Sequence, residues 1–280
     1  MITTMLEPIS HTSWLIPAVK EAYKSREQIA GTWERIVTQI KGKKIEIAVT
    51  GLSGAGKTVL LQHLTGEAFH RGYNPPGRSR SSETGHMPAK GFRIGLNTIP
   101  GQGSHPRLTA IAKIFETKRP VDGVIHVVSN GYVSEREATA REVLSEDLHI
   151  TSIEKLRQHF LEEELRDLDE TLGLIRKSLK KSHKPTWLIV AVAKSDLFYD
   201  QIAGAERYYS PSGDSAFTKK MGQFLQKVGS DNFGWEAIPI AAWLEDFNWN
   251  EESLPSQLRP DQRDHLIGQF AEILEKNCGS

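Results

Sequence analysis

Five short apolar runs recur along the chain, and they predict the strands of a central sheet. Each run is a near-continuous series of apolar residues rather than an alternation of apolar and polar ones, which is typical of parallel strands buried on both faces. Because helical patterns separate the runs, the sequence predicts a three-layer α/β fold with a mostly parallel central sheet. The runs lie at residues 44–50, 91–99, 121–129, 186–193 and 236–242.

Apolar residues three and four positions apart predict the helices between these strands. The longest stripe follows Thr151 and Glu154, which have the spacing of a capping box, and it predicts a long helix over residues 151–182. We interpret its charged run LEEELRDLDE, residues 161–170, as the face exposed to solvent. Shorter helices are expected after Lys57 and around residues 106–115, 134–148, 214–229 and 259–276.

A separate helical stripe precedes the first strand. Apolar residues between Val19 and Ile40 fall on one side of a helix, which therefore covers apolar surface. We expect this helix to pack on the protein's own core, with a partner-binding helix as the alternative. The sequence thus predicts an N-terminal helical extension, residues 1–43, followed by one α/β domain, residues 44–280.

Composition and charge disfavour several classes of function. The 280-residue chain has 35 basic and 35 acidic side chains, so no net charge attracts nucleic acid or anionic lipid. Its single cysteine, Cys278, allows neither an internal disulfide nor a cysteine zinc site, and a reducing cytoplasm is the simplest location. We expect no signal peptide, and no membrane span, because no stretch approaches the roughly 20 apolar residues that one requires.

The strongest candidate chemistry directly follows the first predicted strand. Residues 51–58 read GLSGAGKT and have the G-x-x-x-x-G-K-[ST] spacing of a phosphate-binding loop. The glycines let the backbone wrap a phosphate, and the following helix directs its positive dipole end at the same anion. Lys57 would bridge the outer phosphates, and the Thr58 hydroxyl would bind Mg²⁺. The predicted phosphate-binding residues are Gly51, Ser53, Gly54, Ala55, Gly56, Lys57 and Thr58.

Four further segments follow the phosphate loop in the order of the motifs of Ras-like GTPases. They read TIPGQG at 98–103, VDGVIHVVS at 121–129, AKSD at 193–196 and IAAW at 240–243. From about residue 44 to the C-terminal helix, the chain resembles that family. The resemblance implies a P-loop NTPase fold, the G domain, that binds GTP or GDP with Mg²⁺ and includes Ala242 among the nucleotide-binding residues.

The AKSD segment resembles the N-K-x-D motif that reads guanine in this family. By resemblance, Asp196 accepts hydrogen bonds from the guanine N1 and N2 donors, and the Lys194 stem lies along the base. Ala193 replaces the family's asparagine, which ties the base loop to the phosphate loop. We therefore expect weaker nucleotide retention with an unchanged base preference. Septin-type GTPases are similar in having alanine before the lysine.

The TIPGQG segment departs from the family's D-x-x-G motif. The resemblance implies that Gly101 touches the γ-phosphate and that Gln102 orients the attacking water, while Thr98 replaces the aspartate that reaches Mg²⁺ through water. Bacterial polarity GTPases of the MglA type are similar here, with T-V-P-G-Q. A neutral hydroxyl makes hydrogen bonds about half as strong as those of a carboxylate. We expect looser Mg²⁺ coupling and slow intrinsic hydrolysis.

The 71–91 loop would supply the switch threonine of a Ras-like protein. Thr84 is the only threonine in that loop, so we name it as the γ-phosphate sensor and Mg²⁺ ligand. The chain between Thr84 and Thr98 is too short for the second strand usual in the family. Ser53 stands where these enzymes often have a glycine, and it would obstruct an arginine supplied by a partner.

Other polar and aromatic residues are interpreted as structural. His126, inside an apolar strand, is expected to be a hydrogen-bonded core histidine, and Asp122 to be part of a turn. Trp243, Phe247 and Trp249 are expected to form a packing cluster, because no basic groove accompanies them.

The first functional hypothesis is a GTP-binding switch with slow hydrolysis. Gln102 and Lys57 are its catalytic residues, and Thr58, Thr84 and Thr98 serve Mg²⁺. Its partners would be proteins that read the 71–91 and 100–107 loops, and a homo-oligomer is left open. The alternatives are a scaffold that binds nucleotide without cleaving it and, third, an ATP-dependent P-loop kinase.

Overall fold

The computed structural model describes residues 45–64, 120–135, 137–231 and 233–279, the strands 84–86 and 94–98, and residues 14 and 68. The predicted helices at 19–40 and 106–115, and most of the 71–91 and 100–107 loops, lie outside these residues. Of the proposed N-terminal extension, only Trp14 is described, and its side chain is buried.

A six-stranded sheet in the order β2-β3-β1-β4-β5-β6 forms the centre of the molecule. All its strands run parallel except the edge strand β2, which pairs antiparallel with β3. β4 and β5 are buried along their whole length, as their continuous apolar runs predict. The five predicted strands are confirmed as β1 (Ile45–Gly51), β3 (Ile94–Thr98), β4 (Gly123–Val128), β5 (Trp187–Val192) and β6 (Gly234–Pro239).

The structure contains a strand, β2, in the stretch between Thr84 and Thr98 that was expected to be too short for one. β2 (Thr84–His86) has only three residues, and Thr84 pairs with Asn97. The expectation was wrong because so short a strand uses little of the chain before Thr98. Thr84 therefore begins a paired strand, whereas the sequence analysis placed it in a loop.

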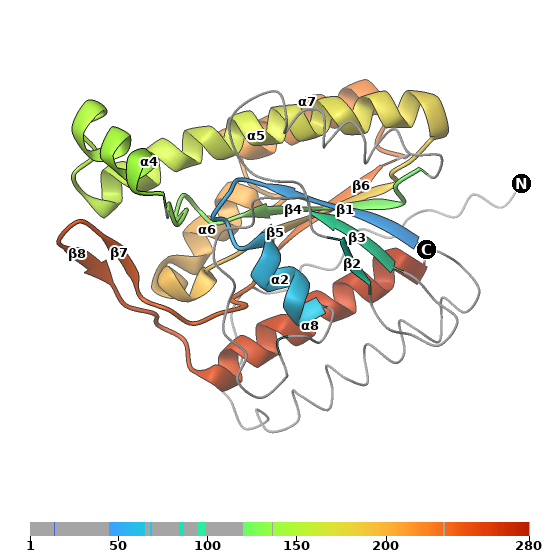
Figure 1. Cartoon of the computed structure of the whole chain (residues 1–280). Helices are drawn as coiled ribbons and strands as arrows, with labels where there is room; N and C mark the ends of the chain where they lie inside the picture. The colour runs from blue at the N-terminus through green and yellow to red at the C-terminus, as the bar shows by residue number, and fades with distance from the viewer. Residues whose placement is uncertain are drawn as a thin grey trace, which may run out of the picture.

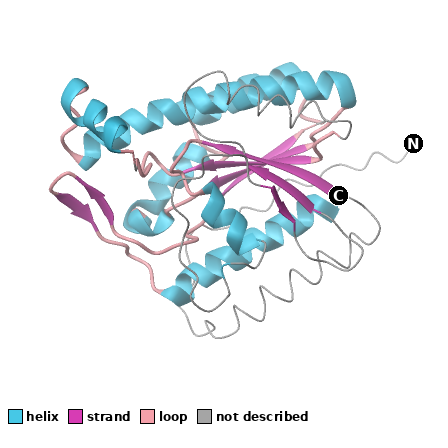
Figure 2. Ribbon diagram, in the orientation of Figure 1, coloured by secondary structure: helices cyan, strands magenta, loops and turns pink. Residues whose placement is uncertain are grey.

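Helices cover both faces of the sheet and give the predicted three layers (Figure 1). The long helix α5 and helix α7 lie along one face, and α2 and α8 lie on the other (Figure 2). Helix α6 was not predicted. The helices are α2 (Lys57–Leu64), α4 (Ala138–Glu142), which continues as the π-helix η3 (Val143–Asp147), α5 (Ile153–Ser182), α6 (Ile202–Tyr209), α7 (Ala216–Val228) and α8 (Pro260–Gly279).

Helix α5 confirms the predicted apolar stripe but corrects two details. Its N-cap is Ser152 rather than Thr151, because the Ser152 hydroxyl accepts the Lys155 N–H at 3.3 Å. Within the charged run interpreted as solvent-exposed, Glu164 and Asp167 are buried. Both lie on the apolar side of the helix, where burial of a carboxylate requires hydrogen-bonding partners.

A small hairpin follows the last strand of the sheet, in the segment between β6 and α8. Its strands are β7 (Phe247–Trp249) and β8 (Glu252–Leu254), and Asn250 in the turn has a left-handed φ of 50°. Strands of three residues carry too little periodicity to be recognised in a sequence. We call residues 244–258 the hairpin segment.

Candidate functional site

The phosphate-loop residues join β1 to α2 in a conformation that needs glycine. Gly51, Gly54 and Gly56 have φ values of 130°, 77° and 106°. A Cβ on Gly51 would lie 2.1 Å from the carbonyl oxygen of Val127, and one on Gly54 would lie 2.3 Å from that of Ser134. The sequence therefore uses glycine here for backbone shape and for close packing against β4 and the segment that follows it.

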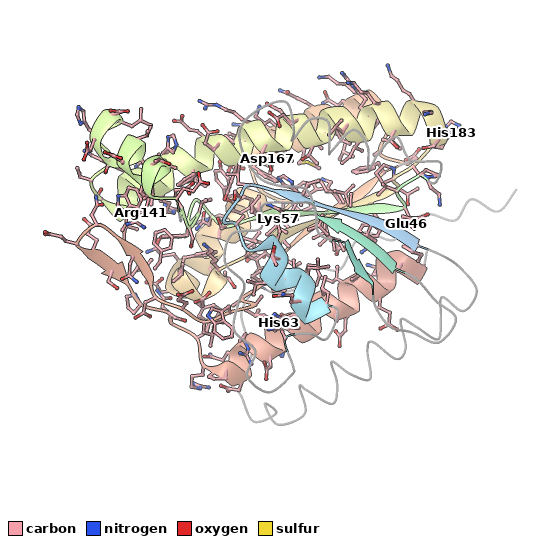
Figure 3. All side chains as sticks on the ribbon, in the orientation of Figure 1. Glu46, Lys57, His63, Arg141, Asp167 and His183 are labelled. Carbon is pink, nitrogen blue, oxygen red and sulfur yellow. The ribbon has the colours of Figure 1, made fainter. Side chains whose placement is uncertain are left out.

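Lys57 folds its ammonium group back over this loop. The side chain is 8% exposed, and Nζ donates to the carbonyl oxygens of Gly51 at 2.8 Å and Leu52 at 2.7 Å. Figure 3 shows Lys57 where β1 passes into α2. The N–H groups in the first turn of a helix have no partners within it. A charged ammonium group and a helix N-terminus thus meet at one loop, which suits an anion.

The strand register brings further candidate residues to the same edge of the sheet. Val49 of β1 is paired with Thr98, the last residue of β3, and Gly51 is paired with Val127 of β4. Thr98 thus ends its strand next to the start of the phosphate loop. Gly101 and Gln102 lie outside the described residues.

Asp196 follows β5 at this edge in a short 3-10 turn, η4 (Ser195–Leu197). Its side chain is 1% exposed, and neither carboxylate oxygen has a hydrogen bond of normal geometry. Burial raises the pKa of Asp196 to about 6, while the nearby Ser256 hydroxyl, the backbone N–H groups of Asp196 and Glu245, and the Lys194 charge oppose that rise. A buried acceptor without a donor is costly unless a ligand supplies one.

Residues 193–196, AKSD, are called the base motif here for their resemblance to N-K-x-D. Lys194 connects this base motif to the loop that follows β4. Its Nζ donates to the carbonyl oxygen of Tyr132 at 2.7 Å and to Oγ of Ser134 at 2.8 Å, and lies 5.5 Å from the ring centre of Phe247. Tyr132 in turn stacks on Phe198 and meets Phe247 edge to face, each at 5.7 Å between ring centres. Phe247 is therefore a packing residue, as predicted.

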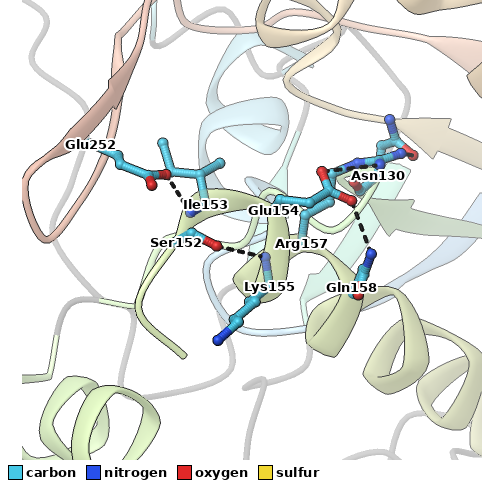
Figure 4. A network of polar contacts seen from close by, with 8 residues as sticks. All are labelled: Asn130, Ser152, Ile153, Glu154, Lys155, Arg157, Gln158 and Glu252. Atoms are coloured by element: carbon cyan, nitrogen blue, oxygen red, sulfur yellow. Dashed lines mark hydrogen bonds and ion pairs between the residues drawn. The ribbon is translucent and has the colours of Figure 1, made fainter. Parts of the chain in front are cut away.

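The loop after β4, residues 129–135, is a part of the site that the sequence analysis missed. We call it the β4 loop. It is held by Glu164 of α5, whose Oε1 accepts the backbone N–H groups of Ser129 at 2.8 Å and Gly131 at 3.1 Å. Arg157 also donates to Asn130, to the carbonyl oxygen and to Oδ1, both at 3.1 Å (Figure 4). No local pattern in the sequence signals this contact, because the burial of Glu164 becomes apparent only in the fold.

The hairpin segment, which the sequence did not predict, also contacts the base motif. The backbone N–H of Gln257 donates to the Asp196 carbonyl at 2.8 Å, and its Nε2 donates to Leu197 at 3.2 Å. At the far end, the Trp249 indole donates to the Ile150 carbonyl at 2.9 Å, and Glu252 accepts the Ile153 N–H at 2.7 Å (Figure 4). The segment therefore spans from the base motif to the start of α5.

Ala242 lies just beyond β6, and it is buried near this same edge. The backbone N–H of Ser195 donates to the Ile240 carbonyl at 3.3 Å, which holds the end of β6 beside the base motif. The structure thus brings Ala242, Lys194 and Asp196 to the edge where the phosphate loop lies.

The remaining candidates have structural partners. His126 is fully buried, with Nδ1 at 2.8 Å from the Thr50 hydroxyl and 3.9 Å from Asp167, as expected for a core histidine. Asp122 accepts the Glu46 N–H at 2.8 Å and forms an ion pair with Lys184. In the described part of the chain, no three His, Cys, Asp or Glu side chains gather as metal ligands. Nor does any helix described there have the length and apolarity to cross a membrane.

Just over half of the chain matches a known protein family. The model of a family described as 50S ribosome-binding GTPase matches residues 46–191, which is more than half of the chain. The chain belongs to this GTPase family. The matched residues include the phosphate loop and Thr98, and they end in β5, just before the base motif of this GTPase.

No curated protein sequence matches this GTPase. Similar solved structures include a dimerization-deficient mutant of Toc33 from Arabidopsis thaliana, with 13% identity over 91% of this chain and 92% of that one, at a TM-score of 0.45. The Sar1 GTPase from Encephalitozoon cuniculi in complex with GDP has 13% identity over 91% of this chain and 92% of that one, at a TM-score of 0.40. The FeoB G-domain from Methanococcus jannaschii has 18% identity over 71% of this chain and 88% of that one, at a TM-score of 0.35. The family assignment rests on the sequence match.

Proposed function

We propose that this GTPase is a guanine-nucleotide switch that hydrolyses GTP slowly. The observation that carries the choice of base is the buried Asp196 carboxylate, which has no hydrogen-bond donor of normal geometry. An ionised carboxylate only accepts hydrogen bonds. Guanine offers two adjacent donors, N1–H and the N2 amino group, whereas adenine presents an acceptor at N1. Guanine therefore suits the site.

The phosphates would bind at the loop from Gly51 to Thr58, which lies at the same edge of the sheet. Lys57 already has its ammonium group over the loop, held by the Gly51 and Leu52 carbonyls. A charge held in place in this way stabilises phosphate oxygens without first being reorganised. Ser53 and Gly56 would contribute backbone N–H groups to the same anion, as would Ala55 once its N–H leaves the Leu52 carbonyl, to which it donates at 3.3 Å.

The residues at this edge also suit Mg²⁺ bound together with the nucleotide. Mg²⁺ in such sites is held by one or two protein oxygens, substrate phosphates and waters, so a cluster of acids is not required. Thr58, half-buried in the first turn of α2, would bind it directly, and Thr98 would do so through water. When bound, Mg²⁺ neutralises charge on the β- and γ-phosphates. The role of Thr84 in sensing the γ-phosphate remains part of the proposal.

Slow hydrolysis follows from the residue types around the γ-phosphate. Gln102 would orient the attacking water, and the Gly101 N–H would contact the γ-phosphate. A threonine at position 98, in the T-x-P-G-Q turn of the MglA type, gives Mg²⁺ a neutral partner in place of a charged one. Effector proteins would read the 71–91 and 100–107 loops as these respond to GTP.

A calorimetric titration tests the binding part of this proposal. We expect GTP and GDP with Mg²⁺ to bind and ATP to bind at least 100-fold more weakly, on the order of the loss from unmatched buried polar groups. Lys57→Ala should abolish binding. Equal affinity for ATP would contradict the guanine assignment and favour the P-loop kinase.

Single-turnover hydrolysis tests the catalytic part. The wild-type protein should convert bound GTP to GDP, and Gln102→Leu should slow that step while leaving GDP affinity unchanged. If bound GTP persists uncleaved in the wild-type protein even with cell lysate added, the protein is a scaffold that binds nucleotide without cleaving it.

A further inference from the structure

One residue, Ser134, joins the base-motif residues to the phosphate loop, through its side chain on one side and its backbone on the other, and no sequence motif predicts it. Ser134 Oγ accepts a hydrogen bond from Lys194 Nζ at 2.8 Å, and the Ser134 N–H donates to the Gly54 carbonyl at 3.3 Å. The carbonyl of Ser134 lies so close to Gly54 that a Cβ there would be 2.3 Å away. Ser134 therefore contacts both halves of the proposed nucleotide site at once.

The position expected to make this link has no polar group. Ala193 lies directly after β5, and its Cβ would be 3.7 Å from a Cβ placed on Gly56. The two loops are thus adjacent at Ala193, but a methyl group cannot hydrogen-bond across them. A link through Lys194 and Ser134 is made instead.

The β4 loop that carries Ser134 is fixed from behind by α5. Glu164 accepts the N–H groups of Ser129 and Gly131, and Arg157 holds Asn130 through two hydrogen bonds. Gly131 has a φ of 80°, and a Cβ at this position would lie 2.3 Å from the Arg157 carbonyl. A loop held in this way presents Ser134 in one place, so little ordering is needed when a ligand binds.

We propose that Ser134 is a positioning residue for nucleotide retention, which ties the base motif to the phosphate loop in place of the asparagine absent at position 193. The inference rests on the proposed function and deepens it. Ser134 acts through Lys194 and Gly54 and reads neither donor of the base. It therefore slows the release of the whole nucleotide without selecting guanine over adenine.

The test is the release rate of a fluorescent GDP analogue, N-methylanthraniloyl-GDP, chased with excess GDP from the full-length protein in Mg²⁺. Ser134→Ala should accelerate release about tenfold, the effect of losing one hydrogen bond to a charged group. Ser134→Thr, which keeps the hydroxyl, should release close to the wild-type rate. Ser145→Ala is the matched control, because the Ser145 hydroxyl bonds only the Glu142 carbonyl on the neighbouring helix.

The ratio of GDP to ADP affinity separates positioning from general damage. We expect Ser134→Ala to leave this ratio unchanged. Release at the wild-type rate from Ser134→Ala, equally fast release from the alanine and threonine variants, or a collapsed ratio would each overturn the proposal. A wild-type protein that binds no guanine nucleotide would instead contradict the proposed function itself.

Discussion

The Glu164 carboxylate accepts a hydrogen bond from the Tyr209 hydroxyl at 2.6 Å, with both side chains fully buried. Through this bond, α6 supports the acid of α5 that holds the β4 loop. Burial raises the pKa of Glu164, although its hydrogen bonds to Tyr209 and to the backbone of Ser129 and Gly131 favour the charged form. The Glu164 carboxylate is tolerated inside the core because the Tyr209 hydroxyl and the N–H groups of Ser129 and Gly131 donate hydrogen bonds to it.

Removing the tyrosine hydroxyl should therefore destabilise the fold. We expect Tyr209→Phe to lower the free energy of unfolding by about 1–3 kcal/mol, because one buried carboxylate oxygen loses its donor. Urea denaturation measures this. Tyr208→Phe, at the neighbouring half-buried tyrosine, should change stability by less than about 0.5 kcal/mol. Equal effects of the two changes would contradict the role given to the hydroxyl.

The raised pKa of Asp196 predicts how stability depends on pH without nucleotide. Since burial raises this pKa from 3.8 to about 6, the folded protein holds the proton more tightly than the unfolded chain does. The resulting stabilisation is fully present below pH 3.8 and is lost as the pH rises through about 6. We expect Asp196→Asn to be more stable than wild type by about 2–3 kcal/mol at pH 8, with a smaller difference at pH 5.

Asp169→Asn is the control for that comparison, because Asp169 lies on the exposed side of α5 and pairs only with Lys220 at the surface. It should change stability by less than about 1 kcal/mol at either pH. A wild-type protein as stable as Asp196→Asn at pH 8, with nucleotide absent, would refute the claim that the Asp196 carboxylate is buried without a hydrogen bond of normal geometry.

Two glycines of the chain should respond oppositely to alanine. Gly54→Ala would place a Cβ 2.3 Å from the Ser134 carbonyl at a φ of 77°, so we expect at least a tenfold loss of guanine-nucleotide affinity. Gly173→Ala on α5 meets nothing within 4 Å and should raise the free energy of unfolding by about 0.5–1 kcal/mol. Titration with guanine nucleotide measures the affinity of each variant, and urea denaturation measures its free energy of unfolding. Unchanged affinity in Gly54→Ala would contradict the packing described.

The hairpin segment should matter for nucleotide affinity through Gln257. Its side chain donates to Leu197 and exchanges hydrogen bonds with Asp200 at 2.8 and 3.1 Å, which holds the turn carrying Asp196. Gln257→Ala should weaken GDP binding several-fold, with an unfolding free energy within about 1 kcal/mol of wild type. Gln158→Ala, which removes only an exposed bond to Glu154, should leave binding unchanged. A larger loss of GDP affinity in Gln158→Ala than in Gln257→Ala would contradict a role of the hairpin segment in nucleotide binding.

Local patterns predicted the strands and the glycine loop because each is encoded within a few adjacent residues. The continuous apolar runs of β4 and β5 and the spacing of Gly51 to Thr58 needed no tertiary information. The same local reasoning placed Glu164 and Asp167 on a solvated face, because the run around them is charged. The burial of Glu164 depends on partners such as Tyr209, 45 residues away in the chain, which no local window contains.

The base side of the site was only partly predictable for a similar reason. Lys194 and Asp196 follow a buried strand and resemble a known motif, so the sequence nominates them as candidates for reading the base. Ser134 and Gln257 reach them from segments about 60 residues away on either side. Neither residue type is distinctive in a loop. Only the pairing of β4, β5 and β6 brings these segments together.

Exchanging the hydrogen-bonding pattern of Asp196 tests the central claim most directly. Xanthine carries a carbonyl oxygen where guanine carries the N2 amino group, so an amide at position 196 can donate where the carboxylate can only accept. Calorimetry should give wild-type protein at least tenfold tighter binding to GDP than to xanthosine diphosphate, and Asp196→Asn the opposite order. An unchanged preference in Asp196→Asn would contradict the account, because the buried carboxylate would then not be the group that reads the base.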